Sequence, residues 1–246
     1  EKADRGLRER PLRLGPRSNP TQLIMTSGRH TLKDFDISLR ELRSEVLVMG
    51  AKVSQSVEAA VKGLLEGSLD SCNEVIADDE VVDAQEMSID EVAMGVMVRF
   101  NPVATDLRMV ISSMNTARSL ERVGDHAVNI ARRGRKILKH GAMEEVKLIE
   151  PLFTMAFIEL KDSLTAYADG NVKLALGLHD KDAELDRLHK RLAKNLSALI
   201  EERESGTLGL IHLMFAARSL ERIGDLAVNI GEEVVFIESA EDIRHQ

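Results

Sequence analysis

The sequence predicts an all-α protein built as two tandem, pseudo-symmetric three-helix bundles with six long helices. Three observations predict this fold class: a composition rich in aliphatic and poor in aromatic residues, long stretches without proline, and an internal repeat. Hydrophobic residues make up 43% of the 246 residues, and aromatic residues only 3%. A chain of this length and apolar content can bury a core. The shortage of aromatic residues favours helices over a β-sandwich or barrel.

Proline and glycine positions divide the chain into predicted helices. Because proline removes a backbone donor and clashes with the preceding turn, stretches without it can form long helices. The prolines are Pro11, Pro16, Pro20, Pro102 and Pro151. Glycine is suited to helix ends, and Gly67, Gly141, Gly170 and Gly206 mark plausible helix ends or turns within the proline-free stretches. The predicted helices cover about 31–66, 69–98, 102–139, 144–169, 171–201 and 204–238.

An internal repeat sets the domain organisation. Residues 114–130 (MNTARSLERVGDHAVNI) match residues 214–230 (MFAARSLERIGDLAVNI) at 13 of 17 positions. Upstream, an offset of 103 aligns three further residues of the two halves: Gly67, Asp79 and Asp83 with Gly170, Asp182 and Asp186. The chain is therefore predicted to be two copies of one three-helix unit. Helices of about 30 residues are about 45 Å long, so each unit should be an elongated antiparallel bundle.

The N-terminal residues differ in character from the rest. Residues 1–24 carry six Lys/Arg against three acids, contain three prolines and show no apolar periodicity. We predict a flexible basic leader over 1–28, a first repeat over 29–141 and a second over 142–246. Two interpretations of the leader are open: either it is native, or Met25 is the natural start.

Composition excludes several classes of function. The net charge is −8, and an acidic body with few aromatic side chains is a poor binder of nucleic acid. Cys72 is the only cysteine, which excludes an internal disulfide or a thiolate zinc site and fits a reducing compartment. No apolar run approaches 18 residues, so membrane contact is expected only through partners. The expected location is cytoplasmic.

Carboxylates four residues apart recur on two predicted helices of each half. At this spacing two side chains share one helix face, with Cβ atoms about 5–6 Å apart, and like charges repel. Clustered carboxylate oxygens suit magnesium, manganese or iron, and helix bundles can hold such ions. The repeated pattern therefore predicts a multinuclear metal site in each half. The pairs are Asp79 with Asp83, Glu121 with Asp125, Asp182 with Asp186, and Glu221 with Asp225.

A second interpretation places these acids on solvated helix faces. Arg118 lies three residues before Glu121, and Arg122 three before Asp125, so both acids could form surface ion pairs, which are weak. A mid-helix glycine recurs at positions 124 and 224 and argues against a fully solvated helix face. Because such a glycine costs about 1 kcal/mol relative to alanine, its presence in both copies predicts close helix packing beside the acids.

Other patterns of catalytic chemistry are missing from the sequence, so no catalytic residue is predicted. His126 is replaced by Leu226 in the second copy, and neither Glu121 nor Glu221 has the histidine three residues on that di-iron oxidases use. No glycine-rich phosphate loop, nucleophile elbow or Ser/His/Asp pattern is present.

The repeated SLER-[VI]-GD-x-AVNI motif, together with RFNPVATDLR before its first copy, resembles the PhoU family of phosphate-regulation proteins over about residues 31–238. The resemblance implies a cytoplasmic, non-enzymatic regulator of phosphate uptake and of the phosphate-starvation response. Its implied partners are the ATP-binding subunit of the phosphate ABC transporter and the phosphate sensor histidine kinase. The second half lacks a counterpart of residues 102–108, and the basic leader is not part of the family pattern.

The resemblance also implies metal clusters, because family members hold multinuclear iron or zinc through [DE]-x-x-x-D motifs. Iron is therefore the expected metal, with zinc, manganese and magnesium as alternatives. A homodimer is compatible with an elongated bundle. Other classes remain open: a metal-storing or metal-dependent helical bundle without a phosphate role, and a purely structural scaffold. In this sequence the motifs fall on Asp79, Asp83, Glu121 and Asp125 in the first half and Asp182, Asp186, Glu221 and Asp225 in the second.

Overall fold

The computed structural model describes residues 20–139, 141, 143–241 and 243, with side chains from Lys33 onward. Contacts divide the chain after Ile37, and the unit from Ser38 to Gln246 holds the second predicted repeat and the first from its residue 38 onward. All regular elements in the described part are helical, so the predicted all-α class is confirmed. Most of the predicted basic leader, residues 1–19, lies outside the described residues.

Each half contains a first helix, an interrupted second helix and a long third helix, which confirms the predicted pair of three-helix units. The first half comprises α1 (Pro20–Glu66), α2 (Leu69–Ala77), α3 (Asp79–Phe100) and α4 (Ala104–Lys139). The second comprises the 3-10 turn η1 (Glu144–Ile149), α5 (Glu150–Asp169), α6 (Val172–Leu176), α7 (Leu178–Glu202) and α8 (Thr207–Ser239).

The predicted boundaries are wrong at three places. The second helix is interrupted in both halves, at Asp78 and at Gly177. Asp78 ends α2 by donating its N–H to the Glu74 carbonyl, and its side chain forms an ion pair with Lys52 of α1. The next helix then starts with acidic residues, which its N-terminal dipole favours. The first helix starts at Pro20 instead of near residue 31, because proline fits the first turn, where its missing N–H is not needed.

Glycine ends the first helix of each half, as predicted. Gly67 follows α1 with φ of 72°, and Gly170 caps α5 with φ of 63°. Both values lie in the left-handed region, where a residue with a Cβ is strained. The turn into the second helix is therefore built in the same way in both halves.

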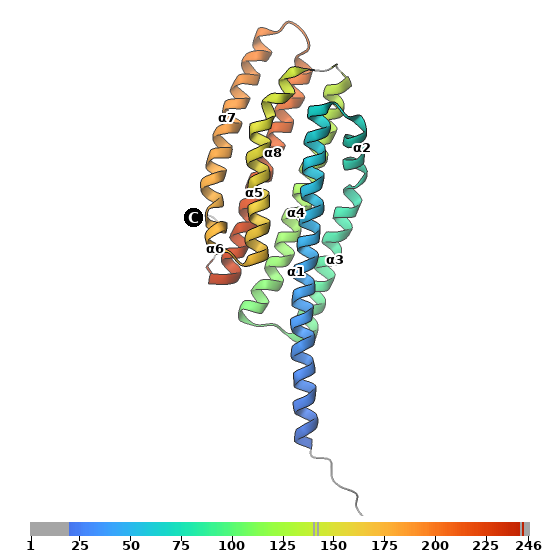
Figure 1. Cartoon of the computed structure of the whole chain (residues 1–246), viewed down its shortest axis with the longest axis vertical. Coiled ribbons are helices and arrows are strands. Elements are labelled where there is room, and N and C mark those ends of the chain that lie inside the picture. The colour runs from blue at the N-terminus through green and yellow to red at the C-terminus, as the bar shows by residue number, and fades with distance from the viewer. Residues whose placement is uncertain (1–19, 140, 142, 242, 244–246) are drawn as a thin grey trace, which may run out of the picture. The chain divides into compact units, whose positions relative to one another are not determined.

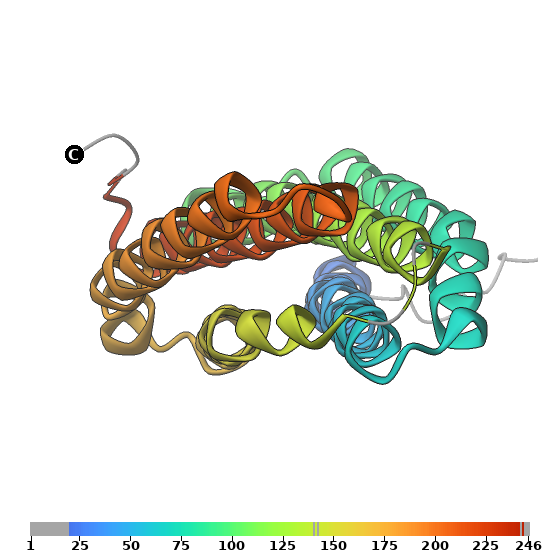
Figure 2. The same cartoon turned by 90° about the horizontal axis from the view of Figure 1, so that it is seen from above.

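The third helices of the two halves, α4 and α8, pack against each other in antiparallel orientation. Near one end the Arg108 guanidinium donates to the Ile237 carbonyl, and near the other Arg133 Nη1 lies 3.4 Å from His212 Nδ1. Figure 1 shows α4 and α8 running side by side. Seen from above, α1 (blue) and α5 (yellow) form one layer, and α4 (green) and α8 (red) belong to the other (Figure 2). Because both central helices carry the repeated segment, the halves are related by an approximate two-fold rotation.

The core is aliphatic, as the composition predicts. Tyr167 is the one aromatic side chain among the buried hydrophobic residues of the described part. Its hydroxyl lies 2.7 Å from Ser113 Oγ on α4, so a hydrogen bond joins the halves inside the core. Within the layer of α1 and α5, Arg43 of α1 donates to the Tyr167 carbonyl. The two bundles therefore share buried contacts and are not separate lobes.

Candidate functional site

The first half brings its predicted acids together between α3 and α4. We call Asp79, Asp83, Glu121 and Asp125 the first carboxylate quartet. Burial raises the pKa of Asp79, and the Asp125 and Asp83 carboxylates raise it further. Burial likewise raises the pKa of Glu121, followed by repulsion from Asp125 and Asp83. Asp79 therefore lies near Asp125, and Asp83 near Glu121, so the pair on α3 lies beside the pair on α4.

The acidic stripe of α3 continues beyond the first quartet. Glu86 also raises the pKa of Glu121, so it faces the same region of α4. Further along, Asp90 Oδ2 lies 4.0 Å from Arg118 Nη2. Asp83 and Asp125 are exposed to solvent, whereas Asp79 and Glu121 are partly buried. The first quartet is therefore half open to water.

The second half repeats this arrangement between α7 and α8. Asp182 and Asp186 on α7 face Glu221 and Asp225 on α8, and we call these four the second carboxylate quartet. The pKa of Asp182 is raised to about 6, by burial first and then by Asp225, Asp186 and Glu221. The Glu221 side chain is only 12% exposed. The second quartet is more strongly shielded from solvent than the first.

The second half holds a fifth acid that the repeat does not predict. Glu159 of α5 is fully buried, and neither of its carboxyl oxygens has a hydrogen-bond partner among the described residues. Burial raises its pKa to about 8, and the Asp182 carboxylate adds to the rise. A Cβ built on Gly224 would lie 2.8 Å from Glu159 Oε2 and 3.3 Å from Asp182 Oδ1. Glu159 therefore reaches the edge of the second quartet.

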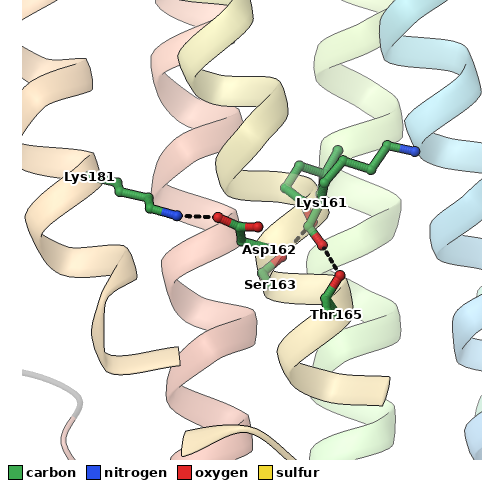
Figure 3. A network of polar contacts seen from close by, with 6 residues as sticks. Lys161, Asp162, Ser163, Thr165 and Lys181 are labelled. Carbon is green, nitrogen blue, oxygen red and sulfur yellow. Dashed lines mark hydrogen bonds and ion pairs between the residues drawn. The ribbon is translucent and has the colours of Figure 1, made fainter. Parts of the chain in front are cut away.

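The nearest lysine does not neutralise Glu159 directly. Lys181 of α7 forms an ion pair with Asp162 of α5, one turn along the helix from Glu159 (Figure 3). The Lys181 charge lowers the pKa of Glu159, but less than burial and Asp182 raise it. A carboxyl group buried without a partner is expensive, so Glu159 is uncharged at neutral pH in the metal-free protein.

A sequence signal for Glu159 existed but was weak. It follows Ala156 by three residues and precedes Ser163 by four, so it lies on the buried face of an amphipathic helix. A single acid at such a position indicates a buried polar group. At the offset of 103 its counterpart in the first half is Ser56, so the repeat could not reveal it.

The two mid-helix glycines confirm the predicted close packing beside the acids. A Cβ on Gly124 would lie 3.2 Å from Val82 Cγ1 of α3. A Cβ on Gly224 would collide with Leu185 of α7 and approach Glu159. Each glycine therefore lets the third helix approach the second at the level of the quartet.

The ion-pair interpretation applies to part of the second quartet. Arg222 Nη1 lies 2.7 Å from Asp225 Oδ2, and Arg222 Nε lies 3.3 Å from Glu221 Oε2. In the first half Arg118 contacts Asp90 instead of the predicted Glu121. The arginines of the repeated motif thus compensate some of the acids without neutralising either quartet.

The donor chemistry of the quartets fits a hard cation, although the side chains as placed do not enclose one. Within the described residues, no three acidic, histidine or cysteine side chains converge on a common point. In the part of the chain that the structure describes, the second half nevertheless holds two buried oxygens without a hydrogen bond or an ion pair, those of Glu159; Glu221 Oε2 accepts no hydrogen bond either but lies 3.3 Å from the charged Arg222 Nε. Bound cations would satisfy these oxygens and relieve the repulsion that raises the pKa values.

A duplicated three-helix unit with a carboxylate quartet between the second and third helices of each copy defines the class of this protein. The PhoU domain matches the chain twice, over residues 46–134 and 151–234, within the two predicted repeats. The chain belongs to the PhoU family, as its motifs predict. No helix in the described part is both long enough and apolar enough to cross a membrane.

Relatives match nearly the whole helical part. The phosphate-specific transport system accessory protein PhoU homolog of Pseudomonas putida is 33% identical over 217 residues, which is 88% of this chain and 85% of that protein. The homolog of Rhizobium meliloti is 32% identical over 212 residues, covering 86% and 90% of the two chains.

Solved structures share the fold. The crystal structure of PhoU from Pseudomonas aeruginosa has a TM-score of 0.81 at 30% identity, covering 84% of this chain and all of that one. The phosphate transport system regulatory protein PhoU from Streptococcus pneumoniae has a TM-score of 0.79 at 26% identity, covering 85% and 99%.

Proposed function

We propose that this protein regulates phosphate uptake and the phosphate-starvation response as a non-enzymatic adaptor on the cytoplasmic side of a phosphate ABC transporter. The match of the PhoU domain to both halves carries this proposal. The relatives named as accessory proteins of the phosphate-specific transport system support the link to phosphate. The name of the Streptococcus pneumoniae neighbour supports a regulatory role.

The proposed partners are the ATP-binding subunit of the transporter and the phosphate sensor histidine kinase. A contact surface for one of them is available on α3, where Met87, Met94 and Val98 are 70%, 51% and 85% exposed. These residues follow a spacing of seven and four, so they form one apolar stripe on the helix. Exposed apolar stripes of this kind are typical of protein interfaces.

Signal transfer between the two partners requires a difference in affinity. A regulator that binds both equally well in every state of the transporter would report nothing. In our proposal the transporter changes the affinity of this protein for the kinase, and by linkage the kinase changes its affinity for the transporter. No chemical turnover is needed for this role.

We further propose that the carboxylate quartets bind metal ions, with multinuclear iron as the first choice and zinc, manganese or magnesium as alternatives. The first quartet would hold the ions through Asp79, Asp83, Glu121 and Asp125. The second would use Asp182, Asp186, Glu221 and Asp225, with Glu159 as an additional oxygen donor. Bound cations would supply positive charge that turns each acidic surface into one able to accept anionic groups.

Co-purification tests the adaptor role. The full chain, tagged, is isolated together with the transporter and kinase subunits, once as the wild type and once with Glu121→Ala and Asp125→Ala. We expect the wild type to retain both partners and the variant to lose at least one. Elemental analysis of the same samples, purified without chelators, reports the bound metal.

The second half provides the matched control. The variant with Glu221→Ala and Asp225→Ala removes the equivalent pair of the second quartet. Comparing which subunits co-purify with each of the two variants shows whether the quartets contact different partners. Far-ultraviolet circular dichroism confirms folding of each variant. If the folded wild-type protein retains neither subunit, the adaptor role is wrong. If the wild type, purified without chelators, contains no metal and still binds both partners, the metal proposal is wrong and the adaptor role stands.

A further inference from the structure

The approximate two-fold axis between α4 and α8 creates two grooves from the same repeated residues. Each groove, one on either side of the axis, receives an Arg-Ser pair from one central helix and an asparagine from the other. The first groove contains Arg118, Ser119 and Asn229, and the second contains Arg218, Ser219 and Asn129. Arg122 lines both. Because of the sequence repeat, both grooves are lined by the same three residue types, arginine, serine and asparagine.

Charge distinguishes the two grooves. The first is lined by Glu232 and Glu233, and Glu233 Oε1 accepts a hydrogen bond of 3.1 Å from Asn115 Nδ2. The positions equivalent to these two acids, 100 residues earlier, are occupied by arginines, and one of them, Arg133, lines the second groove. The second groove thus holds four arginines, and no carboxylate lines it. We call it the arginine groove.

Two of the four guanidinium groups are already engaged. Arg222 pairs with Asp225 on its own helix, at 2.7 Å. Arg133 stacks on the Phe215 ring, with its guanidinium carbon 4.3 Å from the ring centroid. Arg122 and Arg218 are exposed and form no ion pair with any described residue. The latter two are therefore available to a ligand.

The concentration of positive charge needs a counter-charge. The protein as a whole carries a net charge of −8, yet four arginines from two helices converge on a hollow of about 480 Å³. Like charges gathered in a concave site raise the local potential and attract anions. Guanidinium groups bind phosphate-type oxyanions through paired, charge-assisted hydrogen bonds, which gives arginine its preference for these ligands. Ser219 and Asn129 add neutral hydrogen-bonding groups to the lining.

We propose that the arginine groove binds a tetrahedral oxyanion, a phosphate group either free or carried by a small molecule, and that the first groove does not. The ligand lies between Arg122 of α4 and Arg218 of α8, so it bridges the two halves at their shared axis. No quartet carboxylate lines this site, although Arg222 at its edge pairs with Asp225 of the second quartet. It goes beyond the proposed adaptor role, although the choice of phosphate among oxyanions rests on that role.

Calorimetric titration of the full chain tests the site. The protein is dialysed against EDTA, so that metal-bound phosphate makes no contribution, and then titrated in chloride buffer with inorganic phosphate. Arg218→Gln removes an arginine of the arginine groove, and Arg118→Gln removes its two-fold counterpart in the first groove. We expect Arg218→Gln to weaken phosphate binding about tenfold or more, since a charge-assisted hydrogen bond is lost. We expect Arg118→Gln to change it by less than about twofold, because Glu232 and Glu233 keep anions out of the first groove.

Separate titrations identify the source of the phosphate group. Tighter binding of ATP than of inorganic phosphate would indicate a nucleotide, and the reverse would indicate the free ion. Both variants replace exposed side chains, and their melting temperatures check that the fold is intact. The proposal is overturned if the wild type shows no saturable binding of either ligand at millimolar concentrations. Equal weakening by Arg118→Gln and Arg218→Gln would overturn it as well, and neither result would bear on partner binding.

Discussion

The two carboxylate quartets are built from the same repeated positions but lie in different surroundings. In the first half, α1 presents Ser56 at the position where α5 of the second half presents the buried Glu159. The first quartet is half open to water, whereas burial and repulsion raise the pKa of Asp182 in the second to about 6. Duplication has therefore preserved the acids while their protonation and shielding have diverged.

A repeated motif does not ensure a repeated chemical property. The Glu-x-x-x-Asp spacing fixes which side chains share a helix face. Whether those side chains are charged depends on the neighbouring helix, which the motif does not include. In this protein one such difference is Glu159 of α5, which is buried beside the second quartet where α1 has Ser56.

The largest effect is expected from Glu159→Gln, which removes the acid specific to the second half. The folded-state pKa of about 8 lies above the usual value of 4.5, so the folded protein binds more protons than the unfolded chain between these pH values. Stability should therefore fall as pH rises from about 4.5 to 8, by about 2–4 kcal/mol. We expect Glu159→Gln to flatten this dependence, as measured by urea unfolding in EDTA at pH 5, 7 and 9.

The first half supplies the control for this measurement. Glu121→Gln changes an acid that is partly open to solvent, so its effect on the pH dependence should be smaller. Equal slopes of stability against pH for the wild type and Glu159→Gln would show that Glu159 is not protonated on folding.

A second comparison uses the paired glycines. Gly224→Ala places a methyl group against Leu185 and 2.8 Å from Glu159 Oε2, and should destabilise the protein by about 1–3 kcal/mol through overpacking. In Gly124→Ala the contact with Val82 Cγ1 is 3.2 Å, and the gain in helix propensity of about 1 kcal/mol offsets the crowding. Urea unfolding of both variants at pH 7 should show this difference, and its reversal would contradict the closer packing of the second half.

The third prediction concerns metal affinity. If Glu159 adds a donor, the second quartet should bind Mn(II) more tightly than the first. Titration of EDTA-dialysed protein should then show two classes of site. We expect Asp182→Asn to weaken the tighter class about tenfold, and Asp79→Asn to affect only the weaker class. A single class, weakened equally by both substitutions, would mean that the halves are equivalent toward metal.

Much of the fold could be predicted because its determinants are local or repeated. The matching of residues 114–130 with 214–230 and the spacing of the prolines indicated the two three-helix units. The break at Asp78 has no proline or glycine to mark it in the sequence, and the ion pair of Asp78 with Lys52 joins residues 26 positions apart. The early start at Pro20 was missed because proline was interpreted only as a helix breaker.

The candidate site could be predicted only as far as the repeat extended. The eight quartet residues follow from spacing and duplication; the structure places each set of four on two neighbouring helices, and their role as metal ligands stays a prediction. Glu159 and the arginine groove arise from differences between the halves: Glu159 replaces Ser56, and Arg133 stands where the second copy has Glu233. A search for similarity cannot find such features. Metal identity and a homodimer remain predictions.

The antiparallel seam between α4 and α8 also bears on how this chain arose. A gene encoding one repeat would yield a polypeptide whose third helix lies bare along the face that its duplicate now covers. Two such polypeptides would bury that face by pairing about a two-fold axis, as symmetric homodimers commonly do. Joined in one chain, the two copies can differ in sequence. Glu159 and the Glu232–Glu233 pair are the asymmetry that an obligatorily symmetric ancestor could not have carried on one side alone.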